Sequence, residues 1–124
     1  MTRSTWDDAE AAHLADVSGL ARRLLAAEDP YEVALEIMGT SAMVMRVDPA
    51  GSVYRIWGVL TDWIELKPDE RERAEAEMAR AAREWLALDL ADRGAVGTYL
   101  DYWEYDVCGY ERSQPDRGAV APDF

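Results

Sequence analysis

The spacing of apolar residues in the first third of the chain predicts two helices. Apolar residues from Leu14 to Leu25 recur at intervals of three or four and form one stripe, as on the buried face of an amphipathic helix. A second helix is expected after Asp29, an N-cap residue that is followed by a proline at the first helical position. We expect Gly39 to end this second helix.

The pattern changes between residues 41 and 66. A short apolar run around Val44 is followed by the turn-forming sequence DPAGS, and the side chains from Val53 to Leu60 can be divided into two alternating sets. A period of two is typical of a strand, and proline and glycine are typical of the loop between paired strands. The sequence therefore predicts a β-hairpin in this region.

The second half of the chain predicts a long helix followed by a strand. Apolar residues recur at helical spacing from Ala74 to Leu88, with Pro68 near the expected start and Gly94 at the expected end. The next stretch, residues 98–110, fits two structures. As a helix it would place Val96, Tyr99, Leu100 and Trp103 on one stripe. Its abundance of tyrosine and tryptophan favours a strand, which is the structure we predict.

These elements together predict an α+β fold. Two N-terminal helices, a β-hairpin, a long helix and a C-terminal strand would form a small, mostly antiparallel sheet with helices on one face. Residues 1–112 are expected to form a single domain, because no linker divides them. Residues 113–124 contain two prolines and little to bury, so we expect a flexible tail.

The charge of the chain limits the classes of partner. It contains 25 acidic and 13 basic residues, for a net charge of -12. This excess argues against direct binding of nucleic acid or of anionic membranes, which both attract lysine and arginine. It favours a basic protein as partner. We find neither a signal peptide nor an apolar stretch of membrane-spanning length, and therefore expect a cytoplasmic protein.

The content of cysteine and histidine limits the chemistry. The chain has one cysteine, Cys108, and one histidine, His13, too few for a Cys/His-rich metal site or an internal disulfide. Carboxylates close to Cys108 in sequence oppose formation of a thiolate. We therefore expect no metal, no other cofactor and no thiol chemistry.

The stretch 98–110 is the candidate partner-binding surface. Its acids have few basic neighbours along the chain, whereas the acids of the long helix alternate with arginines four positions away. Acids beside aromatic rings can bind arginine and lysine by ion pairing and by cation–π contact. The candidate residues are Asp101, Tyr102, Trp103, Glu104, Tyr105 and Asp106. Trp57 and Trp63 of the predicted hairpin are further anchors if helices cover the opposite face of the sheet, and core residues if helices cover their own face. The alternative interpretation is an edge strand whose rings face the core.

Two single residues are candidates for a different function. Asp62 falls on an apolar face of the predicted second strand, where it is either part of a turn or a functional acid. His13 has Glu10 and Asp16 one helical turn away, so it is either a general base or an ordinary surface residue.

Three functional hypotheses follow. The leading one is a small, non-enzymatic acidic protein that binds, and inhibits or masks, a basic macromolecule such as a nucleic-acid enzyme. In size and charge such a protein is comparable to immunity proteins, antitoxins and phage inhibitors. The alternative is a small-molecule-binding or catalytic domain with a pocket of Trp and Tyr side chains and with Asp62 or His13 as its polar group. The third is a homodimer with its aromatic faces mated.

Overall fold

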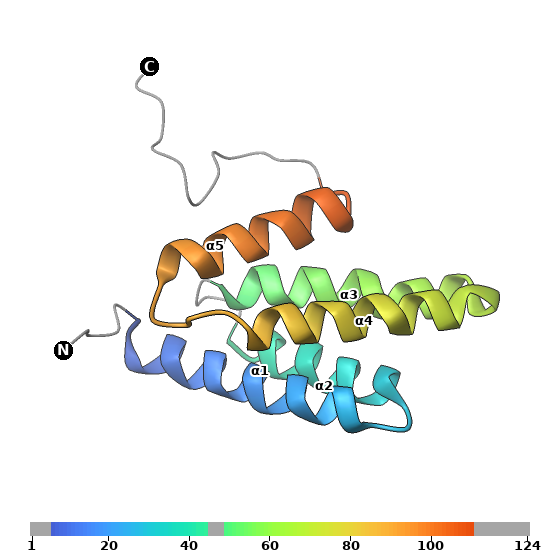
Figure 1. Cartoon of the computed structure of the whole chain (residues 1–124), viewed down its shortest axis with the longest axis horizontal. Helices are drawn as coiled ribbons and strands as arrows, with labels where there is room; N and C mark the ends of the chain where they lie inside the picture. The colour runs from blue at the N-terminus through green and yellow to red at the C-terminus, as the bar shows by residue number, and fades with distance from the viewer. Residues whose placement is uncertain (1–5, 45–48, 111–124) are drawn as a thin grey trace, which may run out of the picture.

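The helical pattern extends over nearly all of the chain that can be described. The computed structural model describes residues 6–44 and 49–110, and within these ranges it contains helices and no strand. The α-helices are α1 (Asp8–Ala26), α2 (Pro30–Ala42), α3 (Ala50–Leu66), α4 (Arg71–Leu86) and α5 (Arg93–Asp101) (Figure 1). A short 3-10 turn, Pro68–Glu70, precedes α4, and a π-helix, Tyr102–Val107, continues α5. The prediction of an α+β fold with an antiparallel sheet is therefore wrong.

Helix α1 begins at a capping box. The side chain of Asp7 accepts a hydrogen bond from the backbone N–H of Glu10 at 2.8 Å. The side chain of Glu10 in turn accepts one from the backbone N–H of Asp7 at 3.0 Å. This reciprocal arrangement satisfies two backbone donors that the start of a helix otherwise leaves open.

Helix α2 starts at Pro30, as predicted, but differs from the prediction in two details. The carboxylate of Asp29 does not cap the helix; it forms an ion pair with Arg71 of α4 at 2.8 Å. The helix also passes through Gly39 and continues to Ala42, because a single glycine lowers helix stability without ending it.

The second predicted strand of the hairpin is part of α3. The large buried apolar residues of α3 are spaced one, three or four positions apart, which is a helical pattern: Val53, Ile56, Trp57, Leu60 and Ile64. The apparent alternation therefore reflected β-branched and aromatic residues whose weak strand preference is overridden by packing. Pro49, expected in the hairpin loop, precedes the first turn of α3, where a missing N–H has no cost. Residues 45–48 lie outside the described part.

The predicted long helix is shorter than expected. Helix α4 ends at Leu86, and a short connection leads to α5. Asp92 caps α5 by accepting a hydrogen bond from the backbone N–H of Ala95 at 3.1 Å. Gly94 therefore lies in the first turn of α5 instead of closing the preceding helix.

The predicted C-terminal strand is helical as well. The buried apolar residues of this segment are Val96, Tyr99, Leu100 and Trp103, which is the stripe expected for a helix. Tyrosine and tryptophan enrichment was the wrong guide, because these rings face the core from one side of a helix. The Tyr99 hydroxyl also donates a hydrogen bond to the backbone carbonyl of Ala81 in α4 at 2.9 Å.

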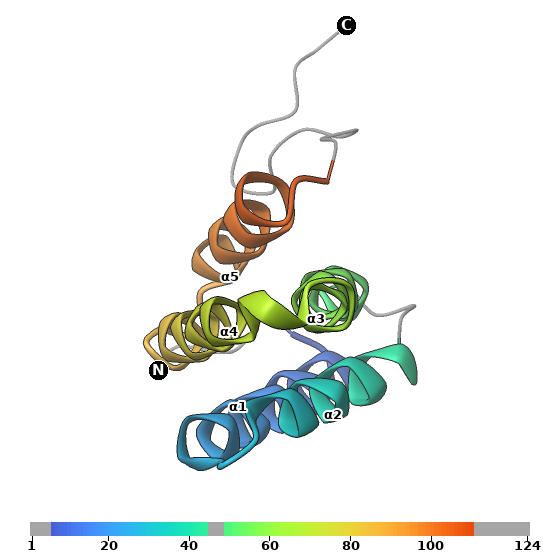
Figure 2. The same ribbon diagram turned by 90° about the vertical axis from the view of Figure 1, so that its right-hand side faces the viewer.

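The helices form three layers. Figure 2 shows α1 beside α2 in one layer, α3 beside α4 in the middle, and α5 on the opposite face of the middle layer. Helix α2 packs mainly on α3, and α1 packs on α4. The connections α1–α2 and α3–α4 are both short. They lie at the same end of the molecule (Figure 1).

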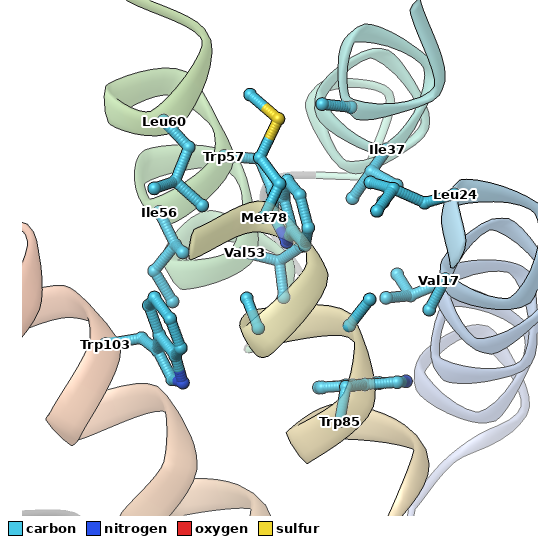
Figure 3. Close-up of a cluster of buried hydrophobic side chains, with 14 of the residues drawn as sticks. Val17, Leu24, Ile37, Val53, Ile56, Trp57, Leu60, Met78, Trp85 and Trp103 are labelled. Carbon is cyan, nitrogen blue, oxygen red and sulfur yellow. The ribbon is translucent and has the colours of Figure 1, made fainter. Parts of the chain in front are cut away.

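The core lies on both sides of the middle layer. Trp85 points from α4 toward α1, and its indole N–H donates a hydrogen bond to the Ser18 hydroxyl at 2.9 Å (Figure 3). Trp103 points from the π-helix toward α3 and α4 (Figure 3). Ala74, Ala81 and Ala82 of α4 are fully buried, and their small side chains allow the neighbouring helices to approach closely.

Two further sequence expectations concern the extent of the domain and its surroundings. The predicted tail, residues 113–124, lies outside the described residues, and the single domain over 1–112 stays a prediction. Among the helices that the structure describes, none combines the length and the apolar character needed to cross a lipid bilayer.

Trp103 should be the side chain that fixes the third layer to the middle one. Its exposed fraction is 0%, so Trp103→Ala should lower the free energy of unfolding by about 3–5 kcal/mol through lost burial and a residual cavity. The neighbouring variant Tyr102→Phe, which removes only a partly exposed hydroxyl, should change it by less than about 1 kcal/mol. Urea unfolding followed by circular dichroism measures both. Equal effects of the two variants would contradict this role of Trp103.

Candidate functional site

The stretch proposed for partner binding contains the π-helix. Its backbone hydrogen bonds join residues that are five positions apart, as in the bond from the N–H of Cys108 to the carbonyl of Trp103 at 2.9 Å. Segments of this kind are rare in proteins, and those that do occur are often found at functional sites. The π-helix widens the turn after α5 at the point where Trp103 enters the core.

Half of the residues proposed to contact a partner are buried. Trp103 has an exposed fraction of 0% and Glu104 of 3%, and Asp101 and Trp57 are buried as well. Tyr102 and Asp106 are exposed, while Tyr105 and Trp63 are half-buried. The stretch therefore does not present its eight candidate residues on one surface, and Trp103 in particular has no surface to offer a partner.

Glu104 has a basic partner that is distant in sequence. Its carboxylate accepts a hydrogen bond from Nε of Arg55 in α3 at 2.6 Å, an ion pair across 49 positions of the chain. The inference from sequence that the acids of this stretch are without basic partners is wrong for Glu104. Packing of the π-helix on α3 brings the two charges together, which no neighbour along the chain could indicate.

Two charged residues of α4 hold the indole of Trp103. The guanidinium of Arg80 lies 4.3 Å from the ring centroid, and Glu84 accepts a hydrogen bond from the indole N–H at 2.9 Å. Arg80 also contacts the Tyr102 ring at 5.5 Å and donates a hydrogen bond to its hydroxyl at 3.0 Å. Glu77 completes the arrangement with an ion pair to Arg80 at 2.8 Å. This charged row of α4, in which acids and arginines alternate along the sequence, therefore contacts the third layer directly.

His13 is enclosed between α1 and α2. Its exposed fraction is 3%, and Nε2 lies 2.9 Å from the hydroxyl oxygen of Ser41 near the end of α2. Within the described residues, Nδ1 has no hydrogen-bond partner. Burial lowers the pKa of His13, and the charge of Asp16 only partly offsets this effect. A histidine and a serine in contact can form a nucleophile–base pair, but both are shut off from solvent here.

Asp62 lies on the exposed surface of α3 and not on the apolar face of a strand. It is close enough to Tyr110 for its charge to contribute to the raised pKa of that phenol, although burial is the main cause. The side chain has the solvation expected of an ordinary surface carboxylate, so burial gives no indication of a catalytic role.

The thiol of Cys108 is half-buried and points at α3. Its sulfur lies 3.7 Å from the backbone carbonyl oxygen of Ile56. Burial, together with the smaller effect of the charges of Glu104 and Glu77, raises the pKa of the thiol to about 12. A thiolate nucleophile therefore does not form here near neutral pH.

The clefts on the described surface include three that bear on these residues. The first, of about 280 Å³, is lined by Trp6, Pro49, Arg93, Gly94, Val96, Gly97 and Leu100. The second, of about 420 Å³, lies between α1 and α2 and is lined by Ala15, Asp16, Gly19, Leu20, Arg23 and Thr40. The third, of about 370 Å³, is lined by Trp63, Arg73, Ala76, Glu77 and Val107. Neither Asp62 nor His13 lines any of these three clefts. In the part of the chain described, no three His, Cys, Asp or Glu side chains are grouped as a metal ion requires.

Sequence analysis missed a concentration of acids at one end of the bundle. The connections α1–α2 and α3–α4 lie at the same end there (Figure 1). An ion pair between Asp29 and Arg71, at 2.8 Å, links the two connections. We call this region the acidic end and define it as residues 27–32 and 65–75, which contain eight acids, Glu28, Asp29, Glu32, Glu65, Asp69, Glu70, Glu72 and Glu75, and three bases, Lys67, Arg71 and Arg73. The signal in the sequence was two short acidic connections, each between helices; when successive helices run up and down, the first and the third connection lie at the same end.

Comparison of the chain with protein-family models, with curated proteins and with solved structures finds no match.

The ion pair between Arg55 and Glu104 should contribute to folding. Glu104→Gln keeps the shape but removes the charge, so we expect the free energy of unfolding to fall by about 1–3 kcal/mol, as for other hydrogen bonds to charged groups. Asp106→Asn, a matched change at an exposed position two residues away, should alter it by less than about 0.5 kcal/mol. Chemical unfolding at pH 7 measures the difference. If the two variants are equally stable, the buried carboxylate has no structural role.

The burial of His13 should make stability depend on pH. A lowered pKa means that the folded protein stays unprotonated at a pH where the unfolded chain, with its ordinary value of 6.5, takes up a proton. Stability from this group is therefore fully present above pH 6.5 and is lost as the pH falls toward the folded-state pKa. Unfolding of the wild type and of His13→Gln at pH 7.5 and pH 5.0 measures this, and the wild type should lose more stability. A parallel loss in both proteins would assign the pH dependence to carboxylates alone.

Proposed function

We propose that the chain is a non-enzymatic protein that binds a basic protein partner through its acidic end. The observation that carries this proposal is the imbalance of charge at the acidic end. Glu28, Glu32 and Glu72 are exposed and, among the described residues, form no ion pair. Their charges therefore act on the solvent and on any molecule that approaches.

The acidic end supports a binding role on physical grounds. A surface with five more acids than bases produces a negative potential that attracts a positively charged protein and speeds its association. A basic enzyme uses its positive surface to hold the phosphates of nucleic acid. Cover of that surface by the acidic end would therefore compete with nucleic acid, which gives the expected inhibition or masking a mechanism.

The arrangement gives less support to a catalytic or small-molecule-binding function. That hypothesis relied on Asp62 or His13 inside a pocket with tryptophan walls. Asp62 is exposed on α3, His13 is enclosed between α1 and α2, and Trp57 is packed in the core. These groups do not converge on one cavity, which a ligand site requires.

The proposal is tested by capture and by charge neutralisation. The immobilised full chain is incubated with lysate of the source cell at low and at high salt, and a retained protein is identified by mass and purified. We expect a protein of net positive charge. The triple variant Glu28→Gln, Glu32→Gln, Glu72→Gln should slow its association about tenfold at low salt and less at high salt. Stopped-flow fluorescence measures this rate.

A second triple variant is the matched control. Asp8→Asn, Asp16→Asn, Asp89→Asn removes the same number of exposed charges from other parts of the molecule, so it should slow association much less. Equal slowing by both triple variants would show that the overall charge is recognised and not the acidic end. Retention of only an acidic protein, or of none at low salt, would contradict the proposal itself. A concentration-dependent dimer of the chain alone would favour the homodimer hypothesis.

A further inference from the structure

Among the described residues, helix α5 and the π-helix cover only part of the groove between α3 and α4. Helix α5 and the π-helix lie along this groove and place Trp103 and Val107, four positions apart, against the middle layer. Figure 1 shows that α3 and α4 continue well past the end of the π-helix. The uncovered continuation, which we call the distal groove, lies between the last turns of α3 and the first turns of α4.

On the α3 side, the distal groove has a partly exposed amphipathic face. Val59, Asp62, Trp63 and Leu66 are spaced three, one and three positions apart, so they share one side of the helix. Leu66 has an exposed fraction of 79%, and Val59 and Trp63 are half-buried. A row of apolar side chains at this spacing is the usual contact face for another helix.

On the α4 side, the groove opens into the cleft of about 370 Å³ that Trp63, Arg73, Ala76, Glu77 and Val107 line. Ala76 is exposed and small, so it leaves room between the two helices. Val107, the last residue of the π-helix, closes the cleft at the end where α5 already occupies the groove. The cleft is therefore a direct extension of an existing helix-packing site.

The margins of the distal groove are negative. The bases on this face are already engaged: Arg73 stacks 5.7 Å from the Trp63 ring centroid and pairs with Glu70, and Arg80 pairs with Glu77. Asp62, on the same face of α3 as Trp63, and Asp106, the neighbour of Val107 in the chain, are both exposed. Because Arg73 already stacks on the Trp63 ring, the two exposed carboxylates are the groups that favour a cationic occupant.

We propose that the distal groove binds a short amphipathic helix from the basic partner, laid along α3 and α4 in continuation of α5. Apolar side chains of the partner helix, spaced three and four positions apart, contact Trp63, Ala76 and Leu66, as Trp103 and Val107 contact the covered part. Its lysines and arginines pair with Asp62 and Asp106. This inference rests on the proposed function for the sign of the partner's charge, and it adds the place and the form of the contact.

Two synthetic peptides test the inference on the full chain. Both are 18-residue helices in which successive leucines are alternately three and four positions apart. The other positions are lysine in one peptide and glutamate in the other. Fluorescence anisotropy measures their affinities. The lysine peptide should bind the wild type, and the glutamate peptide should not. Ala76→Arg, which fills the cleft and adds a positive charge, should weaken binding of the lysine peptide at least tenfold.

Two matched controls separate the groove from general charge and general hydrophobicity. Ala12→Arg places the same side chain at an exposed position of α1, so it changes the net charge equally and should leave the affinity within about twofold. Leu66→Ala should weaken binding about tenfold, whereas Met43→Ala, at a residue that is also highly exposed, should not. Circular dichroism confirms that each variant is folded.

The outcomes distinguish this inference from the proposed function. If Ala76→Arg and Ala12→Arg bind the lysine peptide equally, the groove is not the site, although attraction to basic proteins stands. If the glutamate peptide binds as tightly as the lysine peptide, the basic character of the partner is wrong. If neither peptide binds, or if sedimentation shows a dimer of the chain that Ala76→Arg abolishes, a basic helix is not the occupant and the inference is overturned.

Discussion

Helix α4 lies between two layers of helices and packs against both. One side carries the small and apolar residues Ala74, Met78 and Trp85, which pack toward α1 and the core. The adjacent side carries Arg80 and Glu84, which hold the indole of Trp103. The third layer is therefore attached by an aromatic ring that is buried against charged groups. Removal of this ring would remove both its burial and its electrostatic contacts. The position of α5, and with it the part of the α3–α4 groove that stays open, depends on this contact.

The sequence predicted the helices whose stripes were unambiguous and missed those with competing signals. Helices α1 and α2 and most of α4 follow from spacing and capping residues. Helix α3 was mistaken for a hairpin because a few alternating residues around Ile56 fit a period of two as well as a helical period. The segment around Trp103 was assigned to a strand on composition, although its helical stripe was visible. Hydrophobic spacing over ten or more residues was the better guide than residue preference.

The candidate surface shows a different limit of inference from sequence. Neighbours along the chain suggested that Glu104 had no base and that Arg80 had only the acids of its own helix as partners. Folding reverses both statements, because Arg55 arrives from α3 and Trp103 arrives over Arg80. Charged groups that have partners in the folded structure, although none beside them in the sequence, stabilise the fold. The imbalance that persists lies at the acidic end, where two connections distant in sequence meet.

The half-buried thiol of Cys108 has a practical consequence for spectroscopy. With its pKa raised to about 12, it reacts slowly with maleimides near neutral pH. A second cysteine engineered at an exposed position such as Ala76 or Ala12 would be labelled selectively, with the native thiol left in place. The native sequence is therefore already a suitable background for attaching a single fluorophore or spin label to this molecule.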